Sequence, residues 1–587
     1  MDFKVSAKAL IPLSIAALLQ FLPSCSSYVP QNNEVRLHEL SDADKLNPIT
    51  YQDAGAGYIL KHLFMTLLEI DFKSLELAPG LAKSRPLLEK DSTGTLRITY
   101  ELRPEARWDN GQPITAKDVE FSLKVIKTPK VDNQPNKPYY EFIGDMILYP
   151  DNPLKFTFVC NNTYLLAEAS SGDFPILPSF KYDPQGILAK YSLAQLAKGG
   201  EDLLNDPDLI DFANEFNSEK FQREPAFIEG CGPYKLSQWL TGQRIVLERK
   251  KDWWGDELEG NGFRFQAYPQ KLIYQTINDQ TSALVSLKAG NIDVMRSIKS
   301  KDFAELPQSD KFVQNFNSHT PQQLAYTYIG LNIKKPQFSS VKTRQALAHL
   351  LDVDKMIKTL KYDQAQRVAG PIHPSKQRDY NNDIKPYPYD VEKARKMLAE
   401  DGWKDSNGDG VIDKVINGQK VEFSVVFTYN SGNDERKATA LLFQEEARKV
   451  GINVNVVAQD WSVYLDKQKN HDFDMFFGAW IGTPVPWDPK QIFHTESSNN
   501  GSNYVSWGNS KTDALIDSIR YEIDEVKRSV LYKRFQVVLH EDVPYIFLWA
   551  PFERIAIHKK FTNADTYVMR PGYWEPGFRV GDQSSSN

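Results

Sequence analysis

The second half of the chain alternates between stretches with the apolar spacing of helices and short apolar or β-branched stretches typical of strands. Helices are predicted over residues 279–290, 341–351, 391–400 and 435–450. Strands are predicted over residues 291–294, 328–332, 453–459 and 472–477. Ser340 and Asp390 are placed as helix N-caps, and Gly402 and Gly451 follow helix ends. This alternation predicts an α/β fold with a largely parallel sheet.

The first half carries fewer regular patterns. Residues 58–68 have apolar side chains on one helical face, which predicts an amphipathic helix. Residues 234–249 read as a hairpin of two strands that turns at Thr241-Gly242. Thr115 is placed to cap a helix that begins after a tight turn. Residues 191–224 are acidic and helical, and no role follows from their pattern.

Length and charge narrow the class of protein. A chain of 587 residues exceeds what one hydrophobic core normally serves, so two or three domains are expected. The net charge of −6, from 70 basic and 76 acidic residues, argues against a nucleic-acid partner. The 11 Trp and 27 Tyr suit both a large core and a roomy cleft for a partly apolar ligand.

The first 25 residues have the organisation of an export signal. Lys4 and Lys8 precede an apolar run over residues 9–22, which is too short for a membrane span. The sequence Leu22-Pro23-Ser24-Cys25 then resembles a bacterial lipobox, although Pro23 departs from the usual residue. We expect residues 1–25 to be a lipoprotein signal peptide and Cys25 to become the lipidated first residue. The alternative is a plain secretory signal with an incidental cysteine.

Two further features each leave two interpretations open. Cys160 and Cys231 form either a disulfide or two free buried thiols. Residues 405–413 resemble a calcium loop, but Ile416 stands where a bidentate glutamate is expected. The loop is therefore either a weak structural calcium site or a solvated turn. Its oxygen ligands would be Asp405, Asn407, Asp409 and Asp413.

Motifs for catalysis and for cofactors are missing from the sequence. There is no nucleophile elbow, no phosphate loop with Lys-Ser/Thr, no His-Glu-Xaa-Xaa-His and no Cys-Xaa-Xaa-Cys. The nine histidines are scattered, with no pair at helical ligand spacing. We therefore expect neither an enzyme nor, apart from the calcium loop, a cofactor.

Four segments, in the same order, resemble family 5 extracellular solute-binding proteins, the dipeptide- and oligopeptide-binding components of bacterial ABC importers. They are the turn and hairpin from Gly230 to Gly255, the Trp108–Val119 segment, Gly290–Asp293, and Leu331-Asn332 with Arg344–Ala348. The resemblance implies a type II, cluster C periplasmic-binding-protein-like fold with two lobes and an extra inserted subdomain. It also implies a monomer in the bacterial cell envelope, on the extracytoplasmic side. This monomer would capture peptides by hinge closure and pass them to an ABC permease.

The resemblance also implies a division of the chain. Lobe I would comprise residues 34–71, 172–275 and 546–582, and lobe II residues 276–545. Residues 72–171 would form the inserted subdomain of lobe I. The strand at 272–275 and the segment at 541–549 would cross between the lobes.

In the family, the end of the strand at 472–477 faces the ligand. Trp461, Trp480 and Trp487 are candidate cleft walls, although core packing explains a Trp equally well. In peptide-binding members an Asp three residues after the Trp holds the ammonium group of the peptide. Thr483 occupies that position here. Asp488 either takes over this role or caps a helix beginning near residue 489.

Two other functions compete with peptide capture. The same fold could bind an oligosaccharide or another non-peptide solute, because the usual ammonium anchor is missing and aromatic residues are plentiful. A secreted hydrolase or a surface adhesin could also use this scaffold, but a hydrolase needs an activated nucleophile or a paired-acid site, and the sequence shows neither.

Overall fold

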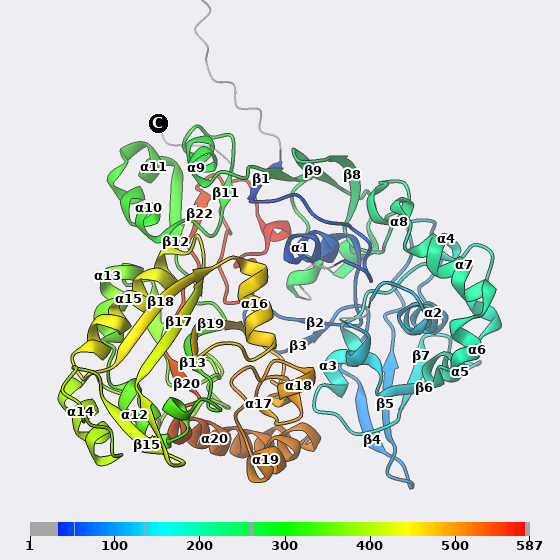
Figure 1. Ribbon diagram of the computed structural model, residues 1–587. Coiled ribbons are helices and arrows are strands. Elements are labelled where there is room, and N and C mark those ends of the chain that lie inside the picture. Colours follow the sequence, from blue (N-terminus) through cyan, green and yellow to red (C-terminus); the bar gives the residue numbers. More distant parts are fainter. Residues whose placement is uncertain (1–32, 52, 134–135, 259, 261, 582–587) are drawn as a thin grey trace, which may run out of the picture.

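The computed structural model describes residues 33–51, 53–133, 136–258, 260 and 262–581 (Figure 1). The expected signal peptide and Cys25 lie outside these residues. The described chain is a mixed α/β structure with six sheets of seven, five, four, two, two and two strands. None of its described helices combines the length and the apolar composition that a membrane crossing requires.

The first lobe is built on the seven-stranded sheet, with β1 (Glu34–Glu39) near its middle. β1 runs parallel to both of its neighbours, whereas the other pairings are antiparallel. The order is β12 (Phe316–His319), β22 (Ile555–His558), β11 (Val294–Met295), β1, β10 (Lys271–Thr276), β9 (Arg244–Arg249) and β8 (Tyr234–Leu240). Helix α1 (Ala54–Leu63) lies against β8. The helix ends five residues before its predicted end at residue 68, because the backbone of Phe64 is extended.

A four-stranded sheet projects from this lobe. Its order is β4 (Leu87–Lys90), β5 (Leu96–Glu101), β7 (Lys155–Cys160) and β6 (Ile143–Leu148), all within the expected insertion. Helix α2 (Ala116–Lys127) begins after Thr115 as predicted, and the Asp118 carboxylate accepts a hydrogen bond from the Thr115 N–H at 2.8 Å. Helix α5 (Leu193–Lys198) packs on α2 and β6, so the segment without a predicted role helps to cover this sheet.

The second lobe contains the five-stranded sheet. Its order is β18 (Asn453–Gln459), β17 (Ser424–Asn430), β19 (Met475–Ile481), β13 (Ala325–Leu331) and β20 (Tyr545–Phe547). β17 is parallel to β18 and β19, but β13 is antiparallel to β19 and β20, so the sheet is only partly parallel. Two separate clusters of buried hydrophobic residues lie in this lobe. Tyr326 and Tyr328 of β13 belong to one cluster and Ile329 and Leu331 to the other, because successive side chains of a strand point to opposite faces of the sheet.

Helices cover this sheet largely where the sequence predicts them. They include α12 (Val341–Ala348), α14 (Val391–Glu400), α15 (Asp434–Arg448) and α20 (Glu525–Asp542). The Asp390 carboxylate accepts a hydrogen bond from the Lys393 N–H at 2.8 Å, and Ser340 caps α12 in the same way. Both predicted caps are confirmed.

The strand pairings place the boundary between the lobes later than predicted. β11 and β12, which the sequence assigned to lobe II, pair within the sheet of the first lobe. The chain crosses at residues 320–324 and returns at residues 552–554, the two crossing segments. They run side by side: Gln322 and Phe552 form an antiparallel bridge, and the Glu553 N–H donates to the Pro321 carbonyl at 2.7 Å. A strand's own sequence does not specify which sheet it joins, which explains the error.

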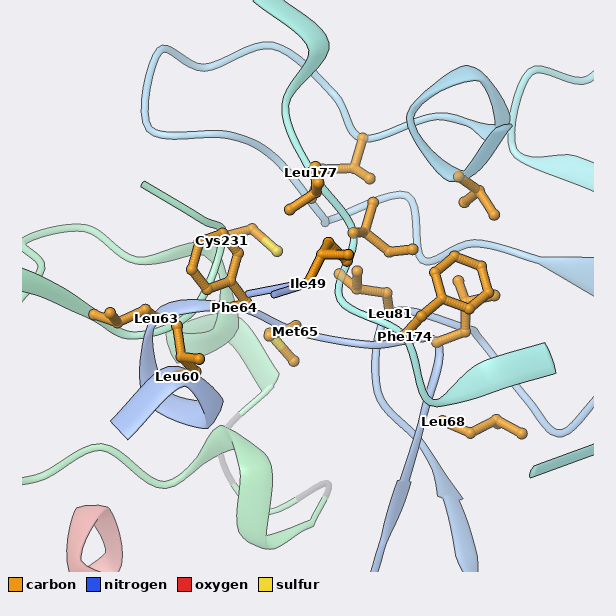
Figure 2. Packing of buried hydrophobic residues seen from close by; sticks show 14 of the residues in the cluster. Ile49, Leu60, Leu63, Phe64, Met65, Leu68, Leu81, Phe174, Leu177 and Cys231 are labelled. Atoms are coloured by element: carbon orange, nitrogen blue, oxygen red, sulfur yellow. The ribbon is translucent and has the colours of Figure 1, made fainter. Parts of the chain in front are cut away.

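The Gly230-Cys231-Gly232 turn packs tightly against the end of α1 (Figure 2). A Cβ on Gly230 would lie 2.4 Å from the Leu63 carbonyl oxygen, and one on Gly232 would lie 2.4 Å from that of His62. Close approach, and not a positive φ, therefore explains both glycines. The Trp253 and Trp254 indoles both donate to the Cys231 carbonyl, at 2.9 and 3.0 Å.

Cys160 and Cys231 are both free and buried, so the disulfide interpretation is wrong for this structure. Cys160 lies at the end of β7, and Cys231 packs beside Phe64 at the end of α1. Burial raises the pKa of each thiol to about 12, which keeps both groups neutral and unreactive near pH 7.

Candidate functional site

A pocket lies in the second lobe at the end of β19 and the start of β13, directly after the first crossing segment. It encloses about 610 Å³ of space, part of which is open solvent. Its lining includes three of the predicted ligand-binding residues, Trp480, Thr483 and Trp487. The structure therefore brings these three together.

Two tryptophans form aromatic walls in different ways. Trp480 is half-buried and stacks on Tyr504, with ring centroids 6.2 Å apart and an interplanar angle of 19°. Trp487 packs against Phe535 and Tyr532, and the Tyr532 hydroxyl donates to its carbonyl oxygen at 2.5 Å. Trp487 is thus also part of the hydrophobic packing of this lobe.

Trp461 does not line this pocket. It is the first residue of α16 (Trp461–Lys469), and 55% of its surface is exposed. Its ring stacks on Tyr464, and the Arg436 guanidinium lies 5.9 Å from its centroid. A contact between Trp461 and the ligand stays a prediction.

Asp488 also lies outside the pocket lining, and both of its carboxylate oxygens have partners. One accepts from the Lys490 N–H at 2.9 Å, at the start of α17 (Lys490–Phe493), and the other pairs with Arg520 Nε at 2.9 Å. The helix-capping interpretation of Asp488 therefore accounts for one oxygen and the ion pair for the other. The role of Asp488 as an ammonium anchor stays a prediction. A ligand ammonium would have to compete with Arg520 and the Lys490 N–H for this carboxylate.

Arg520 lies where the insertion of the first lobe meets the second lobe. Its carbonyl oxygen accepts from the Leu165 N–H at 3.0 Å, and its guanidinium lies 5.8 Å from the centroid of the Tyr164 ring. These contacts, which we call the Arg520 contact, join the lobes far from the crossing segments in sequence.

The pocket lining also includes three polar residues that the sequence did not predict. His373, Lys376 and Asp379 line it from the segment between β14 (Ala365–Arg367) and α14. The Lys376 ammonium donates to the Val485 carbonyl at 2.8 Å, and burial lowers its pKa to about 8. Burial also lowers the pKa of His373 to about 4. No local pattern distinguishes these residues from an ordinary Pro-rich loop.

The predicted calcium loop is satisfied by its own hydrogen bonds. The Asp405 carboxylate accepts from the N–H groups of Gly408 and Gly410, and Asp409 accepts from Asn407 and Val411. Asp413 accepts from Ser406 and lies 3.3 Å from Lys420 Nζ. Within the described ranges, no group of three or more His, Cys, Asp or Glu side chains is placed to hold a metal ion. The geometry is that of the solvated turn, and calcium binding stays an untested prediction.

Comparisons with known proteins agree on one family. The model of bacterial extracellular solute-binding proteins, family 5 Middle, matches residues 76–504. The oligopeptide-binding protein AppA of Bacillus subtilis is 28% identical over 96% of each chain. Its structure with a nonapeptide covers 94% of this chain and 99% of its own, with a TM-score of 0.67 and 25% identity. The structure of NikA of Brucella suis in complex with Fe(III)-EDTA covers 93% of this chain and 100% of its own. Its TM-score of 0.72 at 20% identity shows a shared fold.

Proposed function

The chain belongs to the bacterial extracellular solute-binding proteins of family 5, and from this premise we propose that it captures peptides between its two lobes for an ABC importer. The observation that carries the proposal is the similarity along nearly the full length to an oligopeptide-binding protein. The pocket containing Trp480, Thr483 and Trp487 supports it, because it offers apolar walls with a few polar groups.

Capture would proceed by closure of the lobes. The crossing segments are short and lie side by side, so a rotation about them changes few contacts within either lobe. A ligand that touches both lobes binds the closed form better and shifts the population toward it. Docking of the closed form on a membrane permease would then deliver the peptide.

We further propose that the mature protein is anchored to the membrane through lipidated Cys25. The apolar run followed by Leu22-Pro23-Ser24-Cys25 supports this proposal. In a bacterial host, the wild-type protein should fractionate with membranes, and Cys25→Ser should not be acylated. Recovery of the wild-type protein in the soluble fraction, without added acyl mass, would exclude the anchor.

A ligand screen tests peptide capture directly. Binding to the folded state raises the melting temperature, so the mature domain from residue 33 should melt higher with randomised di- to hexapeptides. A shift with oligosaccharides alone would overturn the peptide assignment. The Trp480–Tyr504 stack and Thr483 are the features that favour this second candidate.

A further inference from the structure

Three buried polar groups in the pocket lining have no hydrogen-bond partner among the described residues. They are the hydroxyl of Tyr326, Nε2 of His373 and the indole N–H of Trp480. Tyr326 is 5% exposed and His373 is 7% exposed, so neither side chain is freely solvated. Leaving such groups unpaired is unfavourable, and a ligand atom in the pocket can pair with them.

The hydrogen bonds of His373 determine what it can offer a ligand. The Ser375 N–H lies 3.1 Å from Nδ1 of His373 and donates to it. Nδ1 is therefore the acceptor of the neutral ring, and Nε2 carries the proton. Since the pKa of His373 is lowered to about 4, this tautomer persists near neutral pH. Nε2–H is thus a donor at the pocket.

Lys376 adds positive charge next to these donors. An ammonium group can donate three hydrogen bonds, and the Val485 carbonyl takes one of them. Among the described residues that line the pocket, Asp379 alone carries a carboxylate, and its Oδ1 lies 3.5 Å from Arg378 Nε. The charge of Asp379 is therefore shared with a second cation.

The position expected to hold a ligand ammonium carries no charge. Thr483 stands there, and Asp488 is engaged by Arg520 and by the Lys490 N–H outside the pocket lining. The pocket thus presents an ammonium and protonated donors where an ammonium-binding site needs carboxylates. This donor-rich composition suits an anionic oxygen ligand.

We propose that this pocket binds a carboxylate group of the ligand, with Lys376 as the specificity-determining residue and His373 and Tyr326 as donors. The inference rests on the proposed capture of peptides and assigns one of its subsites. Two parts of a peptide carry this chemistry, the C-terminal carboxylate and an Asp or Glu side chain. The experiment separates them.

Three randomised pentapeptide libraries without Asp or Glu provide the probes: one with a free C-terminal carboxylate, one C-terminally amidated, and one amidated with a single added Glu. Binding is followed by intrinsic tryptophan fluorescence, because Trp480 and Trp487 line the pocket. We expect the free-acid library to bind about tenfold to hundredfold more tightly than the plain amide. Tight binding of the Glu-containing amide would support the inference and identify the side chain as the source.

The variant Lys376→Met keeps a side chain of similar length without the charge. It should reduce the ratio of the affinities for the carboxylate-bearing and the plain amidated libraries to about one. The matched control is Lys396→Met, whose side chain is 79% exposed on α14, and it should keep the full preference. If Lys376→Met fails to fold, the comparison of the libraries on the wild-type protein still tests whether the pocket binds a carboxylate. Equal binding of all three libraries would overturn this inference and leave peptide capture intact. Failure of every library to bind would overturn the proposed function, and the inference with it.

Discussion

At the scale of single residues, Lys376 should make ligand binding depend on pH. Burial is the main cause of its lowered pKa of about 8; Asp379 raises this pKa, and Arg378 and Arg528 lower it. A bound carboxylate favours the protonated form. Affinity should therefore be steady from pH 6.5 to about 8 and then fall by up to about tenfold per pH unit. His373, with a pKa of about 4, stays neutral over this range.

Fluorescence titrations between pH 6.5 and 10 measure this dependence. The peptides should be N-acetylated, because a free α-amino group also titrates near pH 8. Lys376→Met should give a flat profile. A wild-type profile without any decline above pH 8 would argue that Lys376 does not face the ligand's charge.

A second prediction at this scale concerns Gly232. A methyl group there would lie 2.4 Å from the His62 carbonyl oxygen, and backbone atoms cannot move aside without shifting α1 or the turn. Gly232→Ala should lower the free energy of unfolding by about 1–3 kcal/mol. Gly370→Ala is the control, because its Cβ would meet nothing closer than 3.8 Å. Urea unfolding of both variants measures the difference, and equal midpoints would contradict the packing argument.

At the scale of elements, the helix caps are the features that local sequence predicts best. Asp390→Ala removes the acceptor for the Lys393 N–H and should cost about 1 kcal/mol of stability. Asp390→Asn keeps an acceptor oxygen and should cost much less. Chemical denaturation distinguishes the two variants, and an Ala variant as stable as wild type would mean that solvent replaces the cap.

The predictable and unpredictable elements differ in the range of the interactions that define them. Ser340, Asp390 and Thr115 were identified from the sequence because a cap depends on the next few residues. β11 and β12 were assigned to the wrong lobe because their partner, β22, lies more than 200 residues away in sequence. His373 and Lys376 were missed for the same reason: only the fold brings them beside Trp480.

At the scale of the whole molecule, the Arg520 contact joins the lobes away from the crossing segments, so in the closure that we propose an opening movement would break it. Arg520→Met removes the cation over Tyr164 and the ion pair to Asp488. We expect peptide affinity to fall about threefold to tenfold, because the closed form loses stability relative to the open form. The pocket lining itself is unchanged by this substitution.

Arg395→Met provides the comparison for this variant, since that side chain is half exposed and its nearest acidic partner, Glu392, lies on the surface of α14. Fluorescence titration of both variants with the same peptide library measures the effect. Equal affinities would show that the Arg520 contact does not contribute to closure.

The antiparallel crossing segments also have a consequence for the order of folding. The second lobe, residues 325–551, is one continuous stretch of chain, so its core can form from contacts within that stretch. The sheet of the first lobe is different: β22 fits between β11 and β12 and is the last of its strands to be synthesised. Until residues 555–558 arrive, this sheet has a gap and unpaired strand edges. The lobe that begins the chain is therefore the lobe that should finish folding last.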